Sequence, residues 1–162
     1  MNHNYACTNL SGIYSRGLGV PIDFKIAKKY AIKACTLNDS KACANLGSWY
    51  FNSKKVISHK EAIKYSKKAC ELNNSGGCVT LGNIYAKVDK DILMAKKYYL
   101  TACDLNDASA CKNLGILYAQ DYQYLVSVKA SPILIKNSSE GIGYYLKKSC
   151  SLGNNSACEM LR

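Results

Sequence analysis

The sequence predicts an all-α fold, an α-solenoid of helix–turn–helix repeats of about 36 residues each that disulfide bonds staple together. Three observations predict it: one segment recurs along the chain, a second segment alternates with it, and eight of the nine cysteines form four pairs at one spacing. Two-helix units of this kind bury their apolar faces against their neighbours. With 162 residues and 48% apolar content, the chain can build such a core. We therefore expect a single repeat domain over residues 1–162.

The first recurring segment combines a small residue, a cysteine, a leucine and a tyrosine at fixed positions. Copies begin at Ala6, Ala42, Gly77 and Ala110, and a shortened copy begins at Ala157. Apolar and small residues three, four and seven apart place one stripe along a helix, so this segment predicts the first helix of each repeat. The residue after the leucine is small in every full copy: Ser11, Gly47, Gly82 and Gly115. Its return predicts a close approach of two helix backbones.

The second segment predicts the second helix of each repeat. It reads Ala-x-x-Tyr-x-x-x-Ala-Cys-x-Leu and begins at Ala27, Ala62, Ala95 and, with Ile in place of Ala, at Ile142. Helix-capping residues support the boundaries: Asp23 precedes a second helix, and Asn38-Asp39 and Asn106-Asp107 lead into first helices. We predict helix pairs over about 3–37, 40–72, 75–105 and 108–152, and a terminal helix over 154–162.

An insertion at 120–137 interrupts the last helix pair. It explains why the first-segment cysteines Cys111 and Cys158 are farther apart in the sequence than those of the other copies. It contains Tyr-Gln-Tyr-Leu-Val-Ser-Val, then Pro132 and three aliphatic residues. We predict an extended loop or short strand there, with a disordered surface bulge as the alternative. Insertions in repeat arrays often mark the functional face.

The paired cysteines predict structural disulfides. Each pair spans the end of a second helix and the start of the next first helix, as C-x7-C: Cys35/Cys43, Cys70/Cys78, Cys103/Cys111 and Cys150/Cys158. A short turn brings such positions within bonding reach. Zinc sites favour closer cysteines with further Cys or His ligands, and the chain has only His3 and His59, so we expect neither a metal nor another cofactor. Disulfides indicate an oxidising compartment, and we predict a secreted or periplasmic protein.

Cys7 occupies the second-cysteine position of its copy, and its partner would lie eight residues earlier, before Met1. We therefore expect Cys7 to be unpaired. Residues 1–20 contain no export signal. Both observations lead us to expect the C-terminal part of a longer protein whose export signal is missing from this chain.

These alternating segments resemble the Sel-one-like repeats, which are related to the tetratricopeptide repeat. The Gly17-x-Gly19-Val turn followed by Asp23 resembles that family's inter-helix turn, and a C-x7-C pair in every repeat resembles the secreted cysteine-rich proteins of Helicobacter. The glycine turn is lost in later copies, and the insertion at 120–137 has no counterpart in the family pattern. The resemblance implies an α-solenoid, wound as a right-handed superhelix, that serves protein or peptide interaction. It also implies an alternative, because proteins of this subfamily are often labelled β-lactamases.

The sequence offers little for β-lactamase chemistry. Serine β-lactamases need an S-x-x-K motif together with S-D-N and K-T-G motifs. Only Ser109 and Lys112 match the first motif, by a pattern expected by chance in a chain so rich in serine and lysine, and nothing matches the others. We expect no dedicated catalytic site, with weak penicillin binding or hydrolysis as the alternative function.

Polar residues recur on the face of the first helices that the core stripe leaves free, and they are the candidate peptide-binding groove. The recurring candidates are Asn9, Asn45, Thr80 and Asn113, two residues after each cysteine, and Ser48, Asn83 and Ile116 lie beside them. An amide can both donate to and accept from a peptide backbone. Alternatively, these residues simply tolerate exposure or form an inter-helix hydrogen bond. The recurring tyrosines are interpreted as core, and Trp49 as packing at a repeat junction, with a ligand anchor as its alternative role.

Charge narrows the classes of partner. The net charge is +11, almost entirely from lysine, since Arg16 and Arg162 are the only arginines. Readers of nucleic acid rely on arginine and on exposed aromatic residues, so we expect no nucleic-acid partner. No stretch is apolar for long enough to predict a membrane span. The expected partner is a protein or peptide, acidic ones included, with β-lactam or peptidoglycan-derived ligands as the alternatives.

Overall fold

The computed structural model describes residues 3–53 and 57–162, and within those ranges every regular element is a helix. The contacts divide the chain into two compact units, Met1–Ile84 and Tyr85–Arg162. The all-α prediction is confirmed, and the described helix pairs lie within one residue of the four predicted ranges. A single domain and the right-handed superhelix stay predictions.

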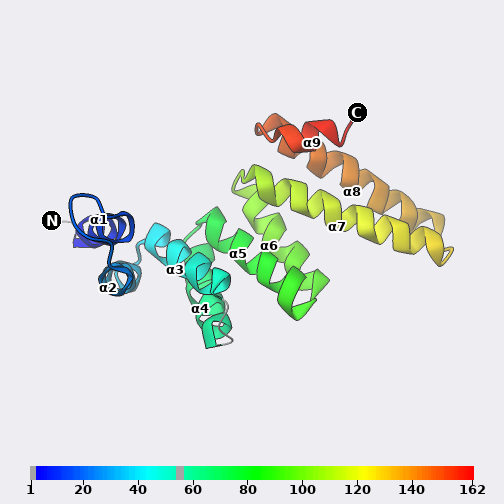
Figure 1. Cartoon of the computed structure of the whole chain (residues 1–162). Helices are drawn as coiled ribbons and strands as arrows, with labels where there is room; N and C mark the ends of the chain where they lie inside the picture. The colour runs from blue at the N-terminus through cyan, green and yellow to red at the C-terminus, as the bar shows by residue number, and fades with distance from the viewer. Residues whose placement is uncertain (1–2, 54–56) are drawn as a thin grey trace. The chain divides into compact units, whose positions relative to one another are not determined.

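Within its described residues, 3–53 and 57–84, the N-terminal unit contains five helices: α1 (His3–Arg16), α2 (Phe24–Thr36), α3 (Ser40–Asn52), α4 (Ile57–Glu71) and α5 (Ser75–Ile84) (Figure 1). Each helix packs on the next one in the chain, and α3 also packs on α5. The core between them is made of small side chains, among them Ala27, Ala31, Ala34 and Ala42, around the fully buried Leu46. Small residues let the helix axes approach closely, and so the repeated alanines set the spacing of the array.

The C-terminal unit begins with the π-helical segment η1 (Tyr85–Asp89). It continues with α6 (Ile92–Asp104), α7 (Ala108–Ser127), α8 (Pro132–Ser151) and α9 (Asn155–Glu159). Here α6 packs on η1 and α7, and α8 packs on α7 and α9. Ala95, Ala102 and Ala110 are fully buried, as their counterparts are in the N-terminal unit. The terminal helix α9 ends at Glu159 and is therefore shorter than the predicted range of 154–162.

The turn between one repeat and the next has the same geometry four times. A left-handed residue comes first, with a φ of 63° at Asn38 and 61° at Asn106. The next residue caps the following helix: the carboxylate of Asp39 accepts from Ala42 N at 2.9 Å. Asparagine and glycine tolerate the left-handed conformation, and aspartate and asparagine are good caps, so the sequence of this turn dictates its shape. The other copies have their left-handed residue at Asn73 and Gly153 and their cap at Asn74 and Asn154.

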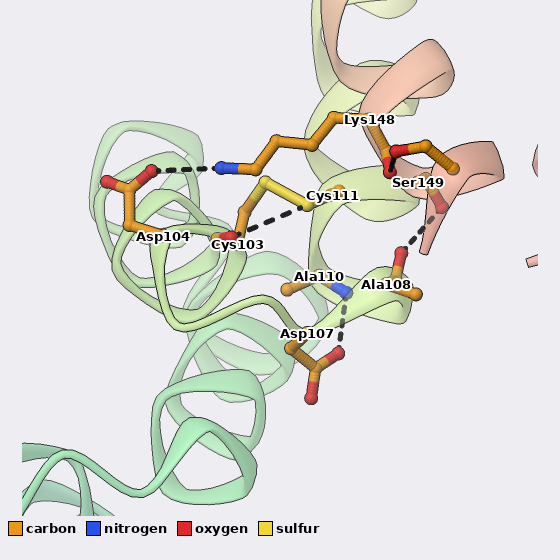
Figure 2. The surroundings of a disulfide bond; sticks show 9 residues. Cys103, Asp104, Asp107, Ala108, Ala110, Cys111, Lys148 and Ser149 are labelled. Atoms are coloured by element: carbon orange, nitrogen blue, oxygen red, sulfur yellow. Dashed lines mark hydrogen bonds and ion pairs between the residues drawn. A yellow bond between two sulfur atoms is a disulfide. The ribbon is translucent and has the colours of Figure 1, made fainter. Parts of the chain in front are cut away.

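Each turn brings two cysteines together, and all four predicted pairs are disulfide-bonded. The Cα–Cα distances are 4.7 to 4.8 Å, and the bonds are Cys35–Cys43, Cys70–Cys78, Cys103–Cys111 and Cys150–Cys158. In Figure 2, the Cys103–Cys111 bond lies beside the cap of Asp107 on Ala110 N, with the Ser149 hydroxyl donating to the carbonyl oxygen of Ala108. The disulfide staple between consecutive repeats is therefore confirmed.

The last staple is less buried than the others. Cys43, Cys78 and Cys111, the second cysteines of the first three pairs, are fully buried. Cys158, the second cysteine of the last pair, is only half-buried. It lies on the short helix α9, which packs on α8. The fourth disulfide is therefore the one most open to a reductant.

The prediction for the insertion is wrong. Residues 120–137 form neither a loop nor a strand, because they lengthen α7 to Ser127 and start α8 at Pro132, which leaves a four-residue turn. Pro132 stands in the first turn of α8, where its missing N–H costs nothing. The β-branched and aromatic residues suggested a strand, but pairing of the two lengthened helices overrides that propensity. The buried Ser138 hydroxyl, which donates to the carbonyl oxygen of Tyr118 at 2.9 Å, is part of that pairing.

The recurring glycine marks a close helix contact, as predicted. A Cβ atom added to Gly47 would overlap the Ser66 hydroxyl and lie 3.0 Å from the Ser66 backbone nitrogen, so α3 and α4 touch there. At Gly115 the added atom would lie 3.1 Å from the side chain of Leu146. Only a residue without a side chain permits the first of these contacts.

Candidate functional site

A cavity of about 420 Å³ lies between α1 and α3 in the N-terminal unit. We call it the α1–α3 cavity. Two exposed amides that the sequence analysis selected line it, Asn9 from α1 and Asn45 from α3. Arg16 and Trp49 also line it. The arginine was not among the predicted site residues, although it is one of only two arginines in the chain.

The other predicted groove residues have different surroundings. Ser48 accepts a hydrogen bond from the Asn52 side chain, also on α3, at 3.3 Å. In α5, Thr80 is buried and its hydroxyl donates to the carbonyl oxygen of Gly76 in its own helix, while Asn83 is half-buried. A groove through all seven predicted residues would need Thr80 to be accessible, and it is 7% exposed.

In the C-terminal unit, Asn113 and Ile116 of α7 are half-buried. The Asn113 side chain hydrogen-bonds Tyr99 of α6. Burial raises the pKa of Tyr99, and this hydrogen bond opposes the rise only in part. Asn113 therefore joins two helices, which is the alternative role that the sequence left open for these amides.

A second cavity, of about 470 Å³, lies between α2 and α3, and we call it the α2–α3 cavity. Phe24 and Lys28 of α2 line one side; Leu46, Trp49, Tyr50 and Asn52 of α3 and the adjoining Ser53 line the other. Phe24 is 66% exposed and Trp49 is 37% exposed, so both present apolar surface at this cavity. Trp49 lines the α1–α3 cavity as well.

The sequence analysis missed the α2–α3 cavity because Phe24 lies three residues before Ala27 and so belongs to the apolar stripe of α2. A residue of that stripe is expected to be buried, as Ala27 is, and not to line a cavity. One signal was available. The corresponding positions in the later second helices are His59, Ile92 and Ser139, so the aromatic residue is peculiar to the first copy.

The recurring tyrosines form pairs that the sequence did not reveal. The tyrosine of the first segment stacks on that of the second in all four copies, with ring centroids 5.4 to 6.2 Å apart: Tyr14/Tyr30, Tyr50/Tyr65, Tyr85/Tyr98 and Tyr118/Tyr145. Tyr85 is the first residue of η1, directly after α5. Burial raises the pKa values of Tyr65 and Tyr145. Of these tyrosines, Tyr50 lines the α2–α3 cavity, and its ring stacks on that of Tyr65.

The weak catalytic candidates line neither cavity. Ser109 is exposed and Lys112 is half-buried on the first turn of α7, and neither residue lines the α1–α3 or the α2–α3 cavity. Cys111, between them, is held in a disulfide.

The cysteines belong to the framework and not to the cavities. None of the eight bonded cysteines lines the α1–α3 or the α2–α3 cavity, and this includes Cys78 in the N-terminal unit and Cys158 in the C-terminal unit. Cys7 is buried in the core cluster of the N-terminal unit and forms no disulfide with any described residue. The predicted disulfide residues therefore support the candidate site without being part of it.

Metal-ligand clusters and membrane spans are both absent from the part of the chain that the structure describes. No group of three or more His, Cys, Asp or Glu side chains in residues 3–53 and 57–162 is arranged to hold a metal ion. No helix in the same ranges has the length and apolar character needed to cross a membrane.

The fold and these surface cavities define a class of protein, the α-solenoid repeat scaffold. The model of the Sel1 repeat family matches residues 4–39, 40–74, 81–107 and 136–154, and the chain belongs to this family. The matches omit residues 108–135, which include most of the insertion.

Solved structures agree with this assignment. The chain is similar to cysteine-rich protein B of Helicobacter pylori, at 34% identity and a TM-score of 0.57, over 86% of this chain and 95% of that one. It is also similar to a Sel1 repeat protein from Oxalobacter formigenes, at 28% identity and a TM-score of 0.75, over 95% of this chain and 60% of that one.

A third similar structure is a protective antigen of uropathogenic Escherichia coli with an SLR fold. Its identity to this chain is 20% and its TM-score is 0.76, over 95% of this chain and 32% of the antigen. The chain thus spans less than two thirds of the Oxalobacter and Escherichia proteins. No curated protein matches the sequence.

Proposed function

We propose that this chain is an interaction scaffold that binds an extended segment of a protein or peptide in the α1–α3 cavity of its N-terminal unit. The observation that carries the proposal is the meeting of two exposed amides, Asn9 and Asn45, from two different helices at one cavity. A peptide backbone presents donors and acceptors alternately, and each amide side chain can satisfy one of each. Sel1 repeats generally mediate protein interactions, which supports the proposal.

Charge favours an acidic partner. The N-terminal unit has twelve basic residues against four acidic ones, whereas the C-terminal unit has ten against seven. Arg16 lies at the α1–α3 cavity, and its guanidinium can pair with a carboxylate in a two-pronged arrangement. An excess of one sign also speeds the encounter with an oppositely charged partner.

We further propose that the scaffold works outside the cytoplasm, in the periplasm or after secretion. Four disulfides support this location, because such bonds persist in oxidising compartments. Mass spectrometry of the native protein without reduction tests the proposal, with four bridges and one free thiol expected. Recovery of all nine cysteines as reduced thiols from the native source would contradict it.

Selection of short random peptides against the oxidised chain tests the binding function, followed by calorimetric titration of the selected peptides. We expect the double variant Asn9→Ala/Asn45→Ala to weaken binding about tenfold, because it removes hydrogen bonds to the peptide backbone. Asn137→Ala, at an exposed site on α8, is the matched control and should bind like the unaltered chain. Selected peptides that bind the double variant equally well would exclude the α1–α3 cavity as the site.

A further inference from the structure

The α2–α3 cavity combines apolar walls with one cation. The Lys28 ammonium lies 4.5 Å from the centroid of the Tyr50 ring, beside the exposed side chains of Phe24 and Trp49. Its volume of about 470 Å³ lies within the range of about 300 to 1,000 Å³ that is usual for small-ligand sites.

The C-terminal unit repeats the lysine–tyrosine contact of this cavity and adds a carboxylate to it. Lys96 occupies in α6 the position that Lys28 occupies in α2, directly after the buried alanine of the stripe. Its ammonium lies 4.7 Å from the centroid of the Tyr118 ring, which corresponds to Tyr50. Lys96 also forms an ion pair with Asp121, three residues after Tyr118. A carboxylate from the chain itself therefore neutralises this lysine.

The N-terminal unit has no such carboxylate. The residue three positions after Tyr50 is Ser53, where the C-terminal unit has Asp121. Lys28 forms no ion pair with any described residue. The other lysines of α2, namely Lys25, Lys29 and Lys33, are likewise exposed and unpaired within the described ranges, and α2 contains no acidic residue.

We propose that the α2–α3 cavity receives an aromatic side chain of a partner peptide, with an adjacent carboxylate of that peptide on Lys28. This inference rests on the proposed function and names the chemistry of the partner. The ligand's carboxylate takes the role that Asp121 has beside Lys96. The aromatic ring covers Phe24 and Trp49, which otherwise expose apolar surface to water. Trp49 borders both cavities, so one peptide segment that runs along α3 reaches both of them.

The test follows the indole N–H signal of Trp49, the only tryptophan in the chain, by NMR during titration of the oxidised full chain. The probes are the acetylated dipeptide amides Phe-Asp, Phe-Asn and Ala-Asp. We expect Phe-Asp to bind at least about fivefold more tightly than the other two, because each of them lacks one of the two interactions. Equal shifts from all three dipeptides would overturn the proposal.

Three variants at exposed positions sharpen the test. Lys28→Gln should abolish the preference for Phe-Asp over Phe-Asn, and Lys29→Gln, with the same charge change outside the cavity, should retain it. Ser53→Asp places a carboxylate at the register of Asp121 and should weaken Phe-Asp binding by supplying that carboxylate from within the chain. Equal effects of the two lysine variants would indicate unspecific attraction to positive charge and would overturn the proposal. A thymidine oligonucleotide serves as a probe for a nucleic-acid ligand, and tighter binding of this probe than of Phe-Asp would also overturn the proposal.

The proposed function and this inference fail separately. If Lys28→Gln leaves the affinity of the selected longer peptides unchanged while Asn9→Ala/Asn45→Ala lowers it, the inference is wrong and the proposed function stands. If the dipeptide preference depends on Lys28 but the longer peptides do not depend on the two asparagines, the inference stands and the α1–α3 cavity is not the peptide site.

Discussion

The helix pairs α3–α4 and α7–α8 share one sequence register and pack in two different ways. In α3–α4, Gly47 faces Ser66, and the helix backbones touch. In α7–α8, Gly115 faces the buried Leu146, whose side chain fills the space between the helices. A small residue in the first helix thus allows either a close backbone contact or a large opposing side chain.

Hydrogen bonding differs between the two pairs as well. Ser138 and Ser149 of α8 donate to the carbonyl oxygens of Tyr118 and Ala108 in α7, at 2.9 and 2.7 Å. By contrast, the Ser66 hydroxyl is completely buried and has no hydrogen-bond partner among the described residues. We call α3–α4 the close pair and α7–α8 the long pair. The comparison teaches that the close pair depends on steric fit, whereas the long pair adds hydrogen bonds between its helices to its packing.

The largest effect should come from Gly47→Ala. The new methyl group meets the backbone of Ser66, which cannot move aside, so we expect a loss of about 3 kcal/mol in the free energy of unfolding. Gly115→Ala meets the flexible side chain of Leu146 and should cost about 1 kcal/mol. Urea unfolding followed by circular dichroism measures both. Equal costs for the two variants would refute the difference in packing.

Removal of one disulfide should lower the free energy of unfolding by nearly as much as Gly47→Ala does. The loss should be the same for a disulfide of the N-terminal unit and for one of the C-terminal unit. Cys35→Ala/Cys43→Ala and Cys103→Ala/Cys111→Ala each open a loop of the same length, and we expect each to lose about 2 to 3 kcal/mol of unfolding free energy. Thermal unfolding with and without reductant tests this expectation. If the costs differ by more than the error of the measurement, the turns are not energetically equivalent despite their shared geometry.

A smaller loss is expected for Ser138→Ala in the long pair. The variant leaves the Tyr118 carbonyl oxygen without the Ser138 donor, and we expect a cost of about 1 kcal/mol. Ser139→Ala, at the exposed neighbouring position, is the matched control and should be neutral. Both are measured by urea unfolding, and a neutral Ser138→Ala would mean that this hydrogen bond does not stabilise the pairing of α7 with α8.

The smallest effect, with the opposite sign, should come from Ser66→Ala in the close pair. It removes a buried hydroxyl that has no described partner, so we expect stability to be unchanged or to rise by up to about 1 kcal/mol. Calorimetric melting detects such a change. A clear loss of stability would show that the hydroxyl has a partner and would weaken the contrast with Ser138.

Local features account for what could be predicted. The turn between Cys35 and Cys43 could be predicted from the sequence, because its residues have strong local preferences. Asn38 favours the left-handed conformation and Asp39 favours the helix N-cap, whatever surrounds them. The insertion was predicted wrongly because residues such as Tyr124 and Val126 favour strands locally, while α8, the helix that pairs with their helix α7, lies on the other side of a turn.

The candidate site was predicted only in part, for the same reason. Their repeated position selected Asn9 and Asn45, which line the α1–α3 cavity. The same pattern also selected Thr80, which is buried, and Asn113, which bonds Tyr99. Periodicity gives the direction of a side chain relative to its own helix. It does not say whether another helix covers that side chain.

The sequence by itself determined the repeat, the paired helices, the capped turns and the four disulfides, because each depends on residues close together in the chain. Tertiary structure alone decided that Gly47 meets Ser66 while Gly115 meets Leu146. It also decided that the insertion becomes helix, and that Phe24, Lys28 and Trp49 line one cavity. These features depend on which side chains from different helices come into contact, and contact between helices is set by packing over the whole unit.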